Sequence, residues 1–421
     1  MEKVDKIVSA SRALIDSETF KEQNRNTDKA FTRMRKLTFP RIVVLIIPKS
    51  VKSLQLRLNE LVDYLGSQPV SNSAFTPARA NLKHPAFISL NNLMLKIRYE
   101  DDDYQRYRGF RLLAVEGSKV RLPDEPKLKE EFGAINYSNQ NEEVHGEHNY
   151  SQVSVLYDVL TRFALTAELA EARADEVDLA IKHLNLIQAG DLILGDRNYA
   201  TYRLIKELES IDFVIRCSAN SFQVAREMFQ GPGTDSRVFN LQINRKKFVK
   251  VRFVSVTLST GEYEVVVTSL SDETTYPTEI FKELYHLRWG VETFYGLLKT
   301  RLELEHFSGK TVESLYQDFH ATVYLTGLES VLTLETNQFL NTKNTSINPQ
   351  QVNHHVSFHA IKSATLNLLW GDIPIPKVLH KLRALFLTNP TLNKKKPSTP
   401  RHKKVTRRWL YYHRNQRQHG F

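Results

Sequence analysis

The sequence predicts an α/β fold in which helices pack against a sheet, with helical regions at both ends of the chain. Three strand-like segments, 112–115, 153–160 and 163–169, come first, and short helices then alternate with strands up to residue 215. Helical periodicity dominates before residue 75 and returns after residue 278. These observations together exclude an all-helical or an all-β protein.

The first 75 residues are predicted to be helical. Apolar residues recur at three-to-four spacing along Lys52–Leu65, which predicts an amphipathic helix. Phe31–Ile47 combines apolar and basic residues, a pattern typical of a small helical unit that either lies on DNA or packs within the protein.

Two short predicted strands run directly into acidic residues. Leu112–Val115 is followed by Glu116-Gly117-Ser118, which predicts a turn, and Leu192–Gly195 is a buried strand that ends at Asp196. Helices are expected at 176–187 and 202–208 and a further strand at 213–215, so that the helices pack against the sheet.

A β-rich segment interrupts this alternation. Gln230–Gly233 breaks the chain, and β-forming residues at 248–258 and 263–270 flank Thr260-Gly261, which predicts a hairpin. We interpret the segment as an insertion into the α/β order. Helices are then expected at 278–304, 323–334 and 360–387.

Composition is that of a folded, soluble protein. The 421 residues are 41% hydrophobic and 25% charged, so wholesale disorder is excluded and two or three domains are expected. The single cysteine, Cys217, excludes an internal disulfide and a cysteine-based zinc site. No signal peptide is evident in Met1–Thr19, and the apolar run Ile42–Ile47 is too short to span a membrane. An intracellular protein is therefore expected.

Positive charge is concentrated near the two ends of the chain. The formal charge is 58 − 47 = +11, and Thr391–Phe421 holds ten Lys or Arg and no acid. Lys21–Lys52 holds nine Lys or Arg against two acids. Both segments suit a polyanionic partner, and Trp409, Tyr411 and Tyr412 in the tail could stack on bases. The alternative is a solvated, disordered tail that aids solubility.

The predicted helix after the insertion carries four polar residues on one side. At 100° per residue, Tyr285, Arg288, Glu292 and Lys299 share a stripe about 60° wide. One interpretation is a functional carboxylate between two cations. The other is a solvated salt-bridge ladder, which is the commoner cause of such spacing.

Three carboxylates are candidates for one pocket. Asp196 and Glu116 follow strands, and ligands of α/β proteins bind where strands end. For either residue taken alone, a turn former or helix cap is the favoured interpretation. With Glu292 they would provide hard oxygen ligands that suit Mg²⁺ or Mn²⁺. Two such ions about 4 Å apart promote phosphoryl transfer.

Weaker signals predict no further site. Ser308-Gly-Lys-Thr imitates the end of a P-loop, but Leu304 stands where the earlier glycine is required, so nucleotide binding is rejected. His145 and His148 are interpreted as an incidental loop pair. Asp158 lies within a strand pattern and is expected to accept structural hydrogen bonds.

Several motifs resemble the DDE transposases of bacterial insertion sequences, specifically the branch with a Tyr-x2-Arg-x3-Glu-x6-Lys signature (insertion sequence family four). Tyr285, Arg288, Glu292 and Lys299 match that spacing at every position. The other matching blocks are Phe31–Pro40, Leu113–Asp124, Ser154–Leu160 and Leu192–Tyr199, so that the resemblance runs from about residue 20 to the basic tail.

The resemblance implies a ribonuclease H-like core with a β-rich insertion. It implies that Glu116, Asp196 and Glu292 bind Mg²⁺ or Mn²⁺, with two ions expected. Arg288 and Lys299 would contact DNA phosphate, and Tyr285 would position the DNA end. The implied activity is DNA transposition, a recombination reaction in which a transposase binds the terminal inverted repeats of its element, cleaves them and transfers the strand to target DNA. A homodimer in the synaptic complex and a cytoplasmic, nucleoid-associated location in a bacterium are implied as well.

The implied organisation has six parts. They are a helical DNA-binding region (1–75), the first part of the core (76–215), the insertion (216–275), the second part of the core (276–335), a helical C-terminal region (336–390) and a basic tail (391–421).

One residue departs from the family pattern. The first acid is usually aspartate, whereas position 116 holds glutamate, whose extra methylene moves the carboxylate by about 1.5 Å; a misplacement of about 1 Å can cost a hundredfold in rate. Asp124 is a lower-ranked substitute. The rival interpretations are a catalytically impaired, transposase-derived DNA-binding protein and a general nuclease without preference for element ends.

Overall fold

The computed structural model describes residues 2–33, 35–49, 54–138, 144–231, 235–257, 261–343 and 349–392. The basic tail from residue 393 onward, with Trp409, Tyr411 and Tyr412, lies outside the described residues, and so does the side chain of His145. The prediction that the tail contacts DNA therefore stays a prediction.

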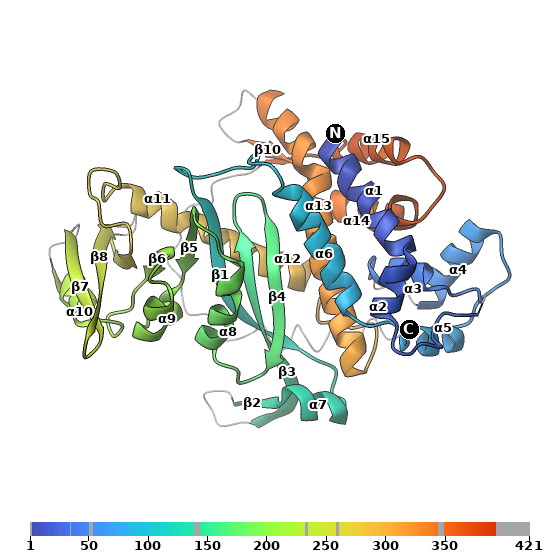
Figure 1. Ribbon diagram of the computed structural model, residues 1–421, viewed down its shortest axis with the longest axis horizontal. Coiled ribbons are helices and arrows are strands. Elements are labelled where there is room, and N and C mark those ends of the chain that lie inside the picture. The colour runs from blue at the N-terminus through green and yellow to red at the C-terminus, as the bar shows by residue number, and fades with distance from the viewer. Residues whose placement is uncertain are drawn as a thin grey trace.

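The fold is built on a mixed sheet with β1 (Arg111–Arg121) near its centre. On one side β1 pairs antiparallel with β3 (Val144–Asp158), which in turn pairs antiparallel with β4 (Phe163–Glu171). On the other side lie β5 (Asp191–Gly195) and β6 (Asp212–Arg216), both parallel to β1. The sheet with its flanking helices confirms the predicted α/β class (Figure 1).

The first strand is longer than predicted, because Glu116-Gly117-Ser118 is not a turn. Glu116 is the register partner of Val155, and Ser118 that of Val153, so β1 continues to Arg121. Pairing with the long strand β3 outweighs the local turn signal of the Gly-Ser pair. By contrast, β5 pairs only with Arg111–Ala114, so β1 extends well past the end of β5.

Three further strands widen the sheet beyond β6. They are β9 (Tyr263–Thr268), β8 (Lys247–Thr257) and β7 (Asp235–Asn244), joined in that order by antiparallel pairing. The predicted antiparallel pairing of the segments at 248–258 and 263–270 is confirmed. Helix α10 (Gln223–Gln230) packs against β8 and β9. At the opposite end of the sheet, β2 (Ala134–Ser138) pairs with the start of β3 beside helix α7 (Pro126–Phe132).

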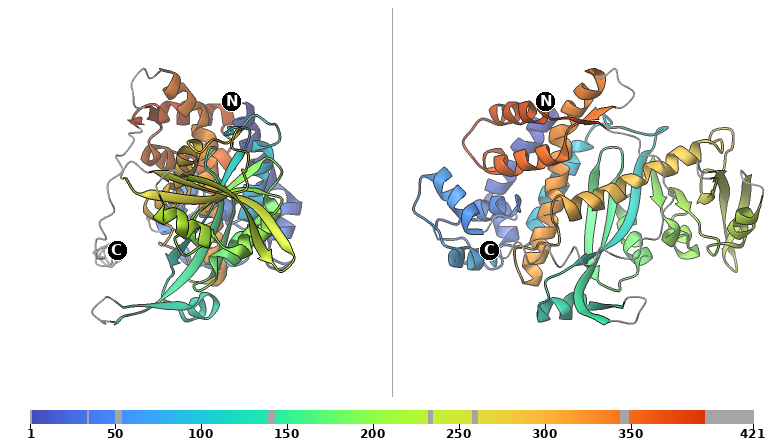
Figure 2. Two further views of the ribbon diagram at one scale, coloured as in Figure 1. Left: turned by 90° about the vertical axis from the view of Figure 1, so that its left-hand side faces the viewer. Right: turned by 180° about the vertical axis from the view of Figure 1, so that it is seen from behind.

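Helices cover both faces of the central strands. Helix α8 (Glu176–His183) packs on β1 and β3, and the 3-10 turns η1 (Leu184–Leu186) and η2 (Arg197–Tyr199) and helix α9 (Tyr202–Glu207) lie near it. On the opposite face, α11 (Ile280–Leu287) and α12 (Trp289–Thr300) cross the sheet, as the view from behind shows (Figure 2). The sequence predicts one helix here, but the structure has a turn between two helices at Arg288.

The N-terminal and C-terminal helices form one helical layer beside β4 (Figure 1). The N-terminal set comprises α1 (Glu2–Asp16), α2 (Glu18–Asn24), α3 (Phe39–Ile46), α4 (Leu54–Leu65), α5 (Asn72–Arg79) and α6 (Pro85–Arg98). The C-terminal set comprises α13 (Val312–Lys343), α14 (His354–Leu369) and α15 (Ile375–Phe386), with the short strands β10 (Gln350–Gln351) and β11 (Thr391–Leu392). The expected domain boundaries after residues 75 and 335 fall inside α5 and α13.

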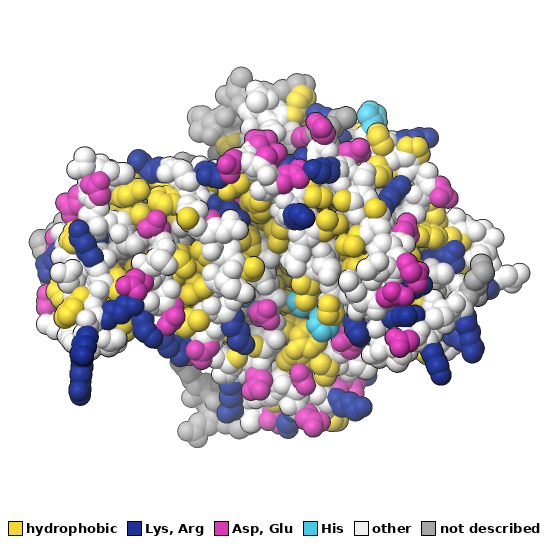
Figure 3. All heavy atoms as spheres, viewed as in Figure 1, with side chains coloured by type: hydrophobic (Ala, Val, Ile, Leu, Met, Phe, Trp, Pro, Cys, Tyr) yellow, Lys and Arg dark blue, Asp and Glu magenta, His cyan; other side chains and the backbone are white. Residues whose placement is uncertain are grey.

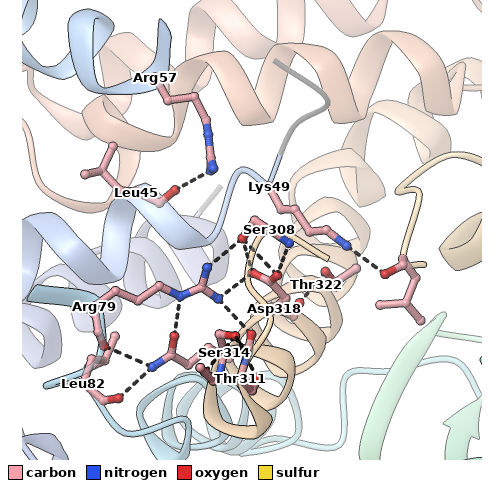
Figure 4. A network of polar contacts seen from close by, with 12 residues as sticks. Leu45, Lys49, Arg57, Arg79, Leu82, Ser308, Thr311, Ser314, Asp318 and Thr322 are labelled. Carbon is pink, nitrogen blue, oxygen red and sulfur yellow. Dashed lines mark hydrogen bonds and ion pairs between the residues drawn. The ribbon is translucent and has the colours of Figure 1, made fainter. Parts of the chain in front are cut away.

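A buried polar network ties the two helical sets together (Figure 4). Arg79 at the end of α5 donates to Asp318 of α13 at 2.9 Å and to Gln317 at 2.6 Å. Lys49 donates to the carbonyl oxygens of Glu303 and Leu304 at 3.1 and 2.8 Å, and burial lowers its pKa to about 8. Each buried cation thus has acceptors, as burial of a charge requires.

No described helix is long and apolar enough to cross a lipid bilayer.

Basic and acidic side chains are interspersed over the face shown in Figure 3, so the charge there does not form one patch of a single sign.

Candidate functional site

Glu116 lies in the middle of β1 and faces the helices α11 and α12. Its Oε2 accepts a hydrogen bond from Nη1 of Arg288 at 2.7 Å, and its side chain is 19% exposed. Since side chains alternate along a strand, Ser118 points to the same face and Gly117 to the other. The strand therefore presents Glu116 to the stripe that the sequence predicts.

Arg288 joins two of the predicted acids. Its Nη2 donates to Oε1 of Glu292 at 2.6 Å while its Nη1 holds Glu116. The side chain is 4% exposed, and its guanidinium carbon lies 5.2 Å from the centre of the buried Tyr285 ring. Arg288 stands at the turn between α11 and α12, which directs it toward β1.

The remaining members of the stripe also face β1. Nζ of Lys299 donates to Oγ of Ser118 at 2.7 Å and to the carbonyl of Lys119 at 2.6 Å. Tyr295, which the sequence analysis did not single out, donates its hydroxyl to the carbonyl of Glu116 at 3.0 Å. The stripe of Arg288, Glu292 and Lys299 is thus directed at the sheet and is not a fully solvated ladder.

Asp196 follows β5, as the sequence predicts, and also caps the turn η2. Its Oδ1 accepts a hydrogen bond from the backbone N–H of Asn198 at 2.8 Å. Asp196 is half-buried, and its charge acts on Glu116 across the end of β5. Here the cap and the candidate ligand are the same residue.

Electrostatics identify a crowded acidic site. Burial raises the pKa of Glu116 to about 7; Arg288 opposes this rise, whereas the charges of Asp196, Glu292 and Glu176 add to it. Burial opposes the charge of Arg288, yet Tyr285 and the two bound carboxylates leave its pKa raised. Arg288 therefore stays charged, and Asp196, Glu292 and Glu176 lie close enough to Glu116 for their charges to raise its pKa.

Glu176 is an acidic neighbour that the sequence analysis missed. It is the first residue of α8, and its carboxylate accepts from Nε2 of Gln152 at 3.0 Å and from Nδ2 of Asn198 at 3.4 Å. The only local signal is its place at the start of a helix, which is common for acidic residues. Its partners come from β3 and η2, so their meeting depends on the tertiary fold.

The other candidate residues lie in separate contacts. Asp124 bonds to Arg121 at 3.1 Å and to His148 at 3.2 Å. Asp158 accepts from Tyr99 at 2.7 Å and from the backbone N–H groups of Leu160 and Thr161, which confirms its structural role. The Ser308 hydroxyl donates to Asp318 at 2.9 Å within the buried network.

The donor chemistry of the site suits a divalent cation. Glu116, Asp196 and Glu292 offer carboxylate oxygens, which Mg²⁺ and Mn²⁺ prefer, and the buried hydroxyl of Tyr199 has no hydrogen-bond partner among the described residues. Within the described part of the chain, no three His, Cys, Asp or Glu side chains are close enough together to hold a metal as they stand. Arg288 lies between Glu116 and Glu292 in this arrangement.

Comparison with known proteins identifies the family of part of the chain. Residues 107–325, somewhat more than half of the chain, match the family model described as "Transposase DDE domain". Comparison with curated proteins gives no match. Among solved structures, the chain is similar to a piggyBac transposase in a synaptic complex with hairpin DNA, determined by cryo-electron microscopy. The identity is 10% and the TM-score 0.49, over 96% of this chain and 88% of that one.

Proposed function

Because the chain belongs to the family of the transposase DDE domain, we propose that it is the transposase of a bacterial insertion sequence, which cleaves the ends of its element and transfers them to target DNA. The observation that supports the proposal is that Arg288 binds both Glu116 and Glu292, while the charge of Asp196 also acts on Glu116. The strand order β4-β3-β1-β5-β6 supports a ribonuclease H-like core.

The proposed branch of the family is insertion sequence family four. Its support is the spacing of Tyr285, Arg288, Glu292 and Lys299, all carried by α11, α12 and the turn between them. The β7–β9 strands, which come between Asp196 and Glu292 along the chain, would be the β-rich insertion of this branch.

Glu116, Asp196 and Glu292 would hold the divalent ions, Mg²⁺ or Mn²⁺. When bound, the ions would activate the attacking oxygen and stabilise the leaving oxygen of the scissile phosphodiester. Arg288 binds Glu116 and Glu292 with separate nitrogens of its guanidinium, so both carboxylates point toward it. To take a cation between them, the two carboxylates must release at least part of their contact with Arg288, whose guanidinium would then be available to a DNA phosphate.

The DNA would contact the chain at several places. Arg288 and Lys299 would bind phosphate near the scissile bond, and Tyr285, which packs against Arg288, would help position the end. The helical region 1–75 would recognise the terminal inverted repeats, and the tail would add affinity that does not depend on sequence. A homodimer would hold two ends together in the nucleoid of the bacterium.

The test is cleavage of DNA that carries the cognate element end, with Mg²⁺ or Mn²⁺ present. Asp196→Ala and Glu292→Ala should each abolish strand cleavage while binding of the end, measured by gel shift, persists. Random duplex of equal length is the control substrate, and equal cleavage of both would indicate a general nuclease. Cleavage that survives either substitution would show that the assigned site is wrong.

A further inference from the structure

Glu176 is placed against the strand that carries Glu116. A Cβ added at Gly117 would lie 2.8 Å from both Cδ and Oε1 of Glu176, closer than real side chains tolerate. A glycine within a strand weakens the strand, and it is often found where another group approaches the backbone closely. Gly117, the residue after Glu116 in β1, therefore makes room for the Glu176 carboxylate and for Nε2 of Gln152, which would lie 2.7 Å from the same Cβ.

The end of β5 lets groups from both faces of the sheet meet. Glu116 and Gly117 point to opposite faces of β1, so a continuous sheet would separate Glu116 from Glu176. The pairing of β1 with β5 stops at Ala114, and Asp196 follows the last residue of β5. Past that point no described strand covers the edge of β1 on the side of Asp196. Glu116 from one face and Glu176 from the other can therefore both approach Asp196.

One residue links Glu176 to Asp196. The backbone N–H of Asn198 donates to Oδ1 of Asp196 at 2.8 Å, and its side-chain Nδ2 donates to Oε2 of Glu176 at 3.4 Å. The 1% exposed Gln152 fixes the other oxygen of Glu176 at 3.0 Å. In the described part of the chain no ion pair joins Lys or Arg to either acid, in contrast to Glu116 and Glu292, which share Arg288.

A buried hydroxyl in the same place has no described partner. Tyr199 is completely buried, and its hydroxyl makes no hydrogen bond to any described residue. Burial raises the pKa of Tyr199, and the charges of Glu176, Glu116 and Asp196 raise it further, which places the hydroxyl among these acids. Buried hydroxyls are normally paired, so the Tyr199 hydroxyl is a hydrogen-bonding group that a ligand near these acids could satisfy.

We propose that Glu176 is a fourth carboxylate of the metal site, which stands beside Glu116 and Asp196 over the side-chain-free Gly117. The proposal rests on the metal-dependent function proposed above. Among the described residues Glu176 forms no ion pair with Arg or Lys, and its two amide partners hold its orientation before any cation arrives. It thus adds negative charge on the α8 face, where Arg288 does not reach.

The experiment measures Mn²⁺ binding to the full chain by calorimetry, without DNA, so that the readout is independent of cleavage. Glu176→Gln keeps the size of the side chain and removes its charge. Asp178→Asn is the matched control, because Asp178 lies on the same helix, is exposed and pairs with Arg203. Thermal melting confirms that each variant is folded.

We expect Glu176→Gln to weaken Mn²⁺ binding at least tenfold and Asp178→Asn to leave it unchanged. Gly117→Ala, which pushes the Glu176 carboxylate away, should weaken it as well. If Asp196→Asn weakens binding but Glu176→Gln does not, the inference is wrong and the proposed function stands. If the wild-type chain binds no Mn²⁺, or Asp196→Asn binds it normally, the metal-dependent function itself fails.

Discussion

The glutamate at position 116 has a defined contact that aspartate would not reproduce. Its Oε2 lies 2.7 Å from Arg288, while the Glu116 backbone is fixed by pairing with Val155 in mid-strand. A side chain shorter by one methylene ends about 1.5 Å sooner, beyond hydrogen-bond distance. We therefore propose a site that is adapted to glutamate, as opposed to one that glutamate has damaged.

Glu116→Asp tests this directly. We expect end cleavage to fall about a hundredfold, since a carboxylate displaced by about 1.5 Å is costly for phosphoryl transfer. The measurement is the single-turnover rate on cognate end DNA at saturating Mn²⁺. A sharp increase would instead identify the natural chain as an impaired, DNA-binding derivative of a transposase.

A buried histidine makes stability depend on pH. Burial lowers the pKa of His183 to about 4, and its Nε2 is 2.9 Å from Oγ of Ser154. The unfolded chain takes up a proton near pH 6.5, whereas the folded chain does so only near pH 4, so stability is lost as the pH falls between these values.

His183→Gln should remove this contribution. Between pH 7 and pH 5 the wild-type chain should lose about 2 kcal/mol more unfolding free energy than the variant does. Urea denaturation at the two pH values measures the difference. His355→Gln, an exposed substitution on α14, should leave the wild-type pH dependence in place; an equal effect of both variants would contradict the assignment.

At the scale of elements, close packing decides where a helix tolerates a side chain. Gly327 in α13 faces β4, and a Cβ there would lie 2.8 Å from Cε1 of Phe163 and 2.5 Å from Cε of Met94. The Met94 tip can move, but the Phe163 ring is fully buried and held in the strand. Gly296 in α12 has no atom within 4 Å of the same position.

Two matched substitutions follow from this contrast. Gly327→Ala should destabilise the protein by about 1–3 kcal/mol, because overpacking outweighs the gain in helix propensity. Gly296→Ala should stabilise it by up to about 1 kcal/mol. Thermal denaturation of both variants gives the sign of each effect, and stabilisation by Gly327→Ala would contradict the packing described here.

Local patterns predicted those elements that are buried on both sides. The strand Leu192–Gly195 was predictable because its continuous apolar run leaves little alternative. The second half of β1 was not, since Ser118 and Lys119 are polar and their strand conformation comes from pairing with β3. The turn at Arg288 was also missed, because helical periodicity continues through it.

The candidate site was predictable to a similar extent. The stripe of Arg288, Glu292 and Lys299 follows from helical spacing, and the structure places Arg288 and Lys299 in contact with β1. Glu176 was not predictable from local sequence, because its relation to Gly117 requires α8 to pack across β1. Glu116 became a candidate because it follows a predicted strand, and the resemblance to a family then made it the first acid. Its contact with Arg288 could not be derived from sequence.

At the scale of the whole molecule, the net charge of +11 nearly equals the ten positive charges of the tail. Deleting residues 393–421 should therefore weaken DNA binding at low salt and make binding less dependent on salt. The slope of log K against log salt is negative, and each lost phosphate contact makes it shallower by about 0.9. Fluorescence anisotropy with random duplex at several salt concentrations measures the slope.

A charge-matched variant separates charge from chain length. Replacing the ten basic tail residues by glutamine in the full-length chain should reproduce the effect of the deletion. An unchanged slope in both variants would support the other interpretation of the tail, a segment that aids solubility only.

The long helix α13 has a genetic consequence. Its 32 residues pack against α3 and α6 near one end of the chain, against β4 in the sheet, and against α14 and α15 near the other end. A gene interrupted before this helix would yield an N-terminal fragment that lacks α13. The apolar surfaces of α3, α6 and β4 that pack against α13 would then be exposed. Frameshifted copies should therefore be degraded, and they should not persist as stable inhibitors that compete with the intact protein for its binding sites.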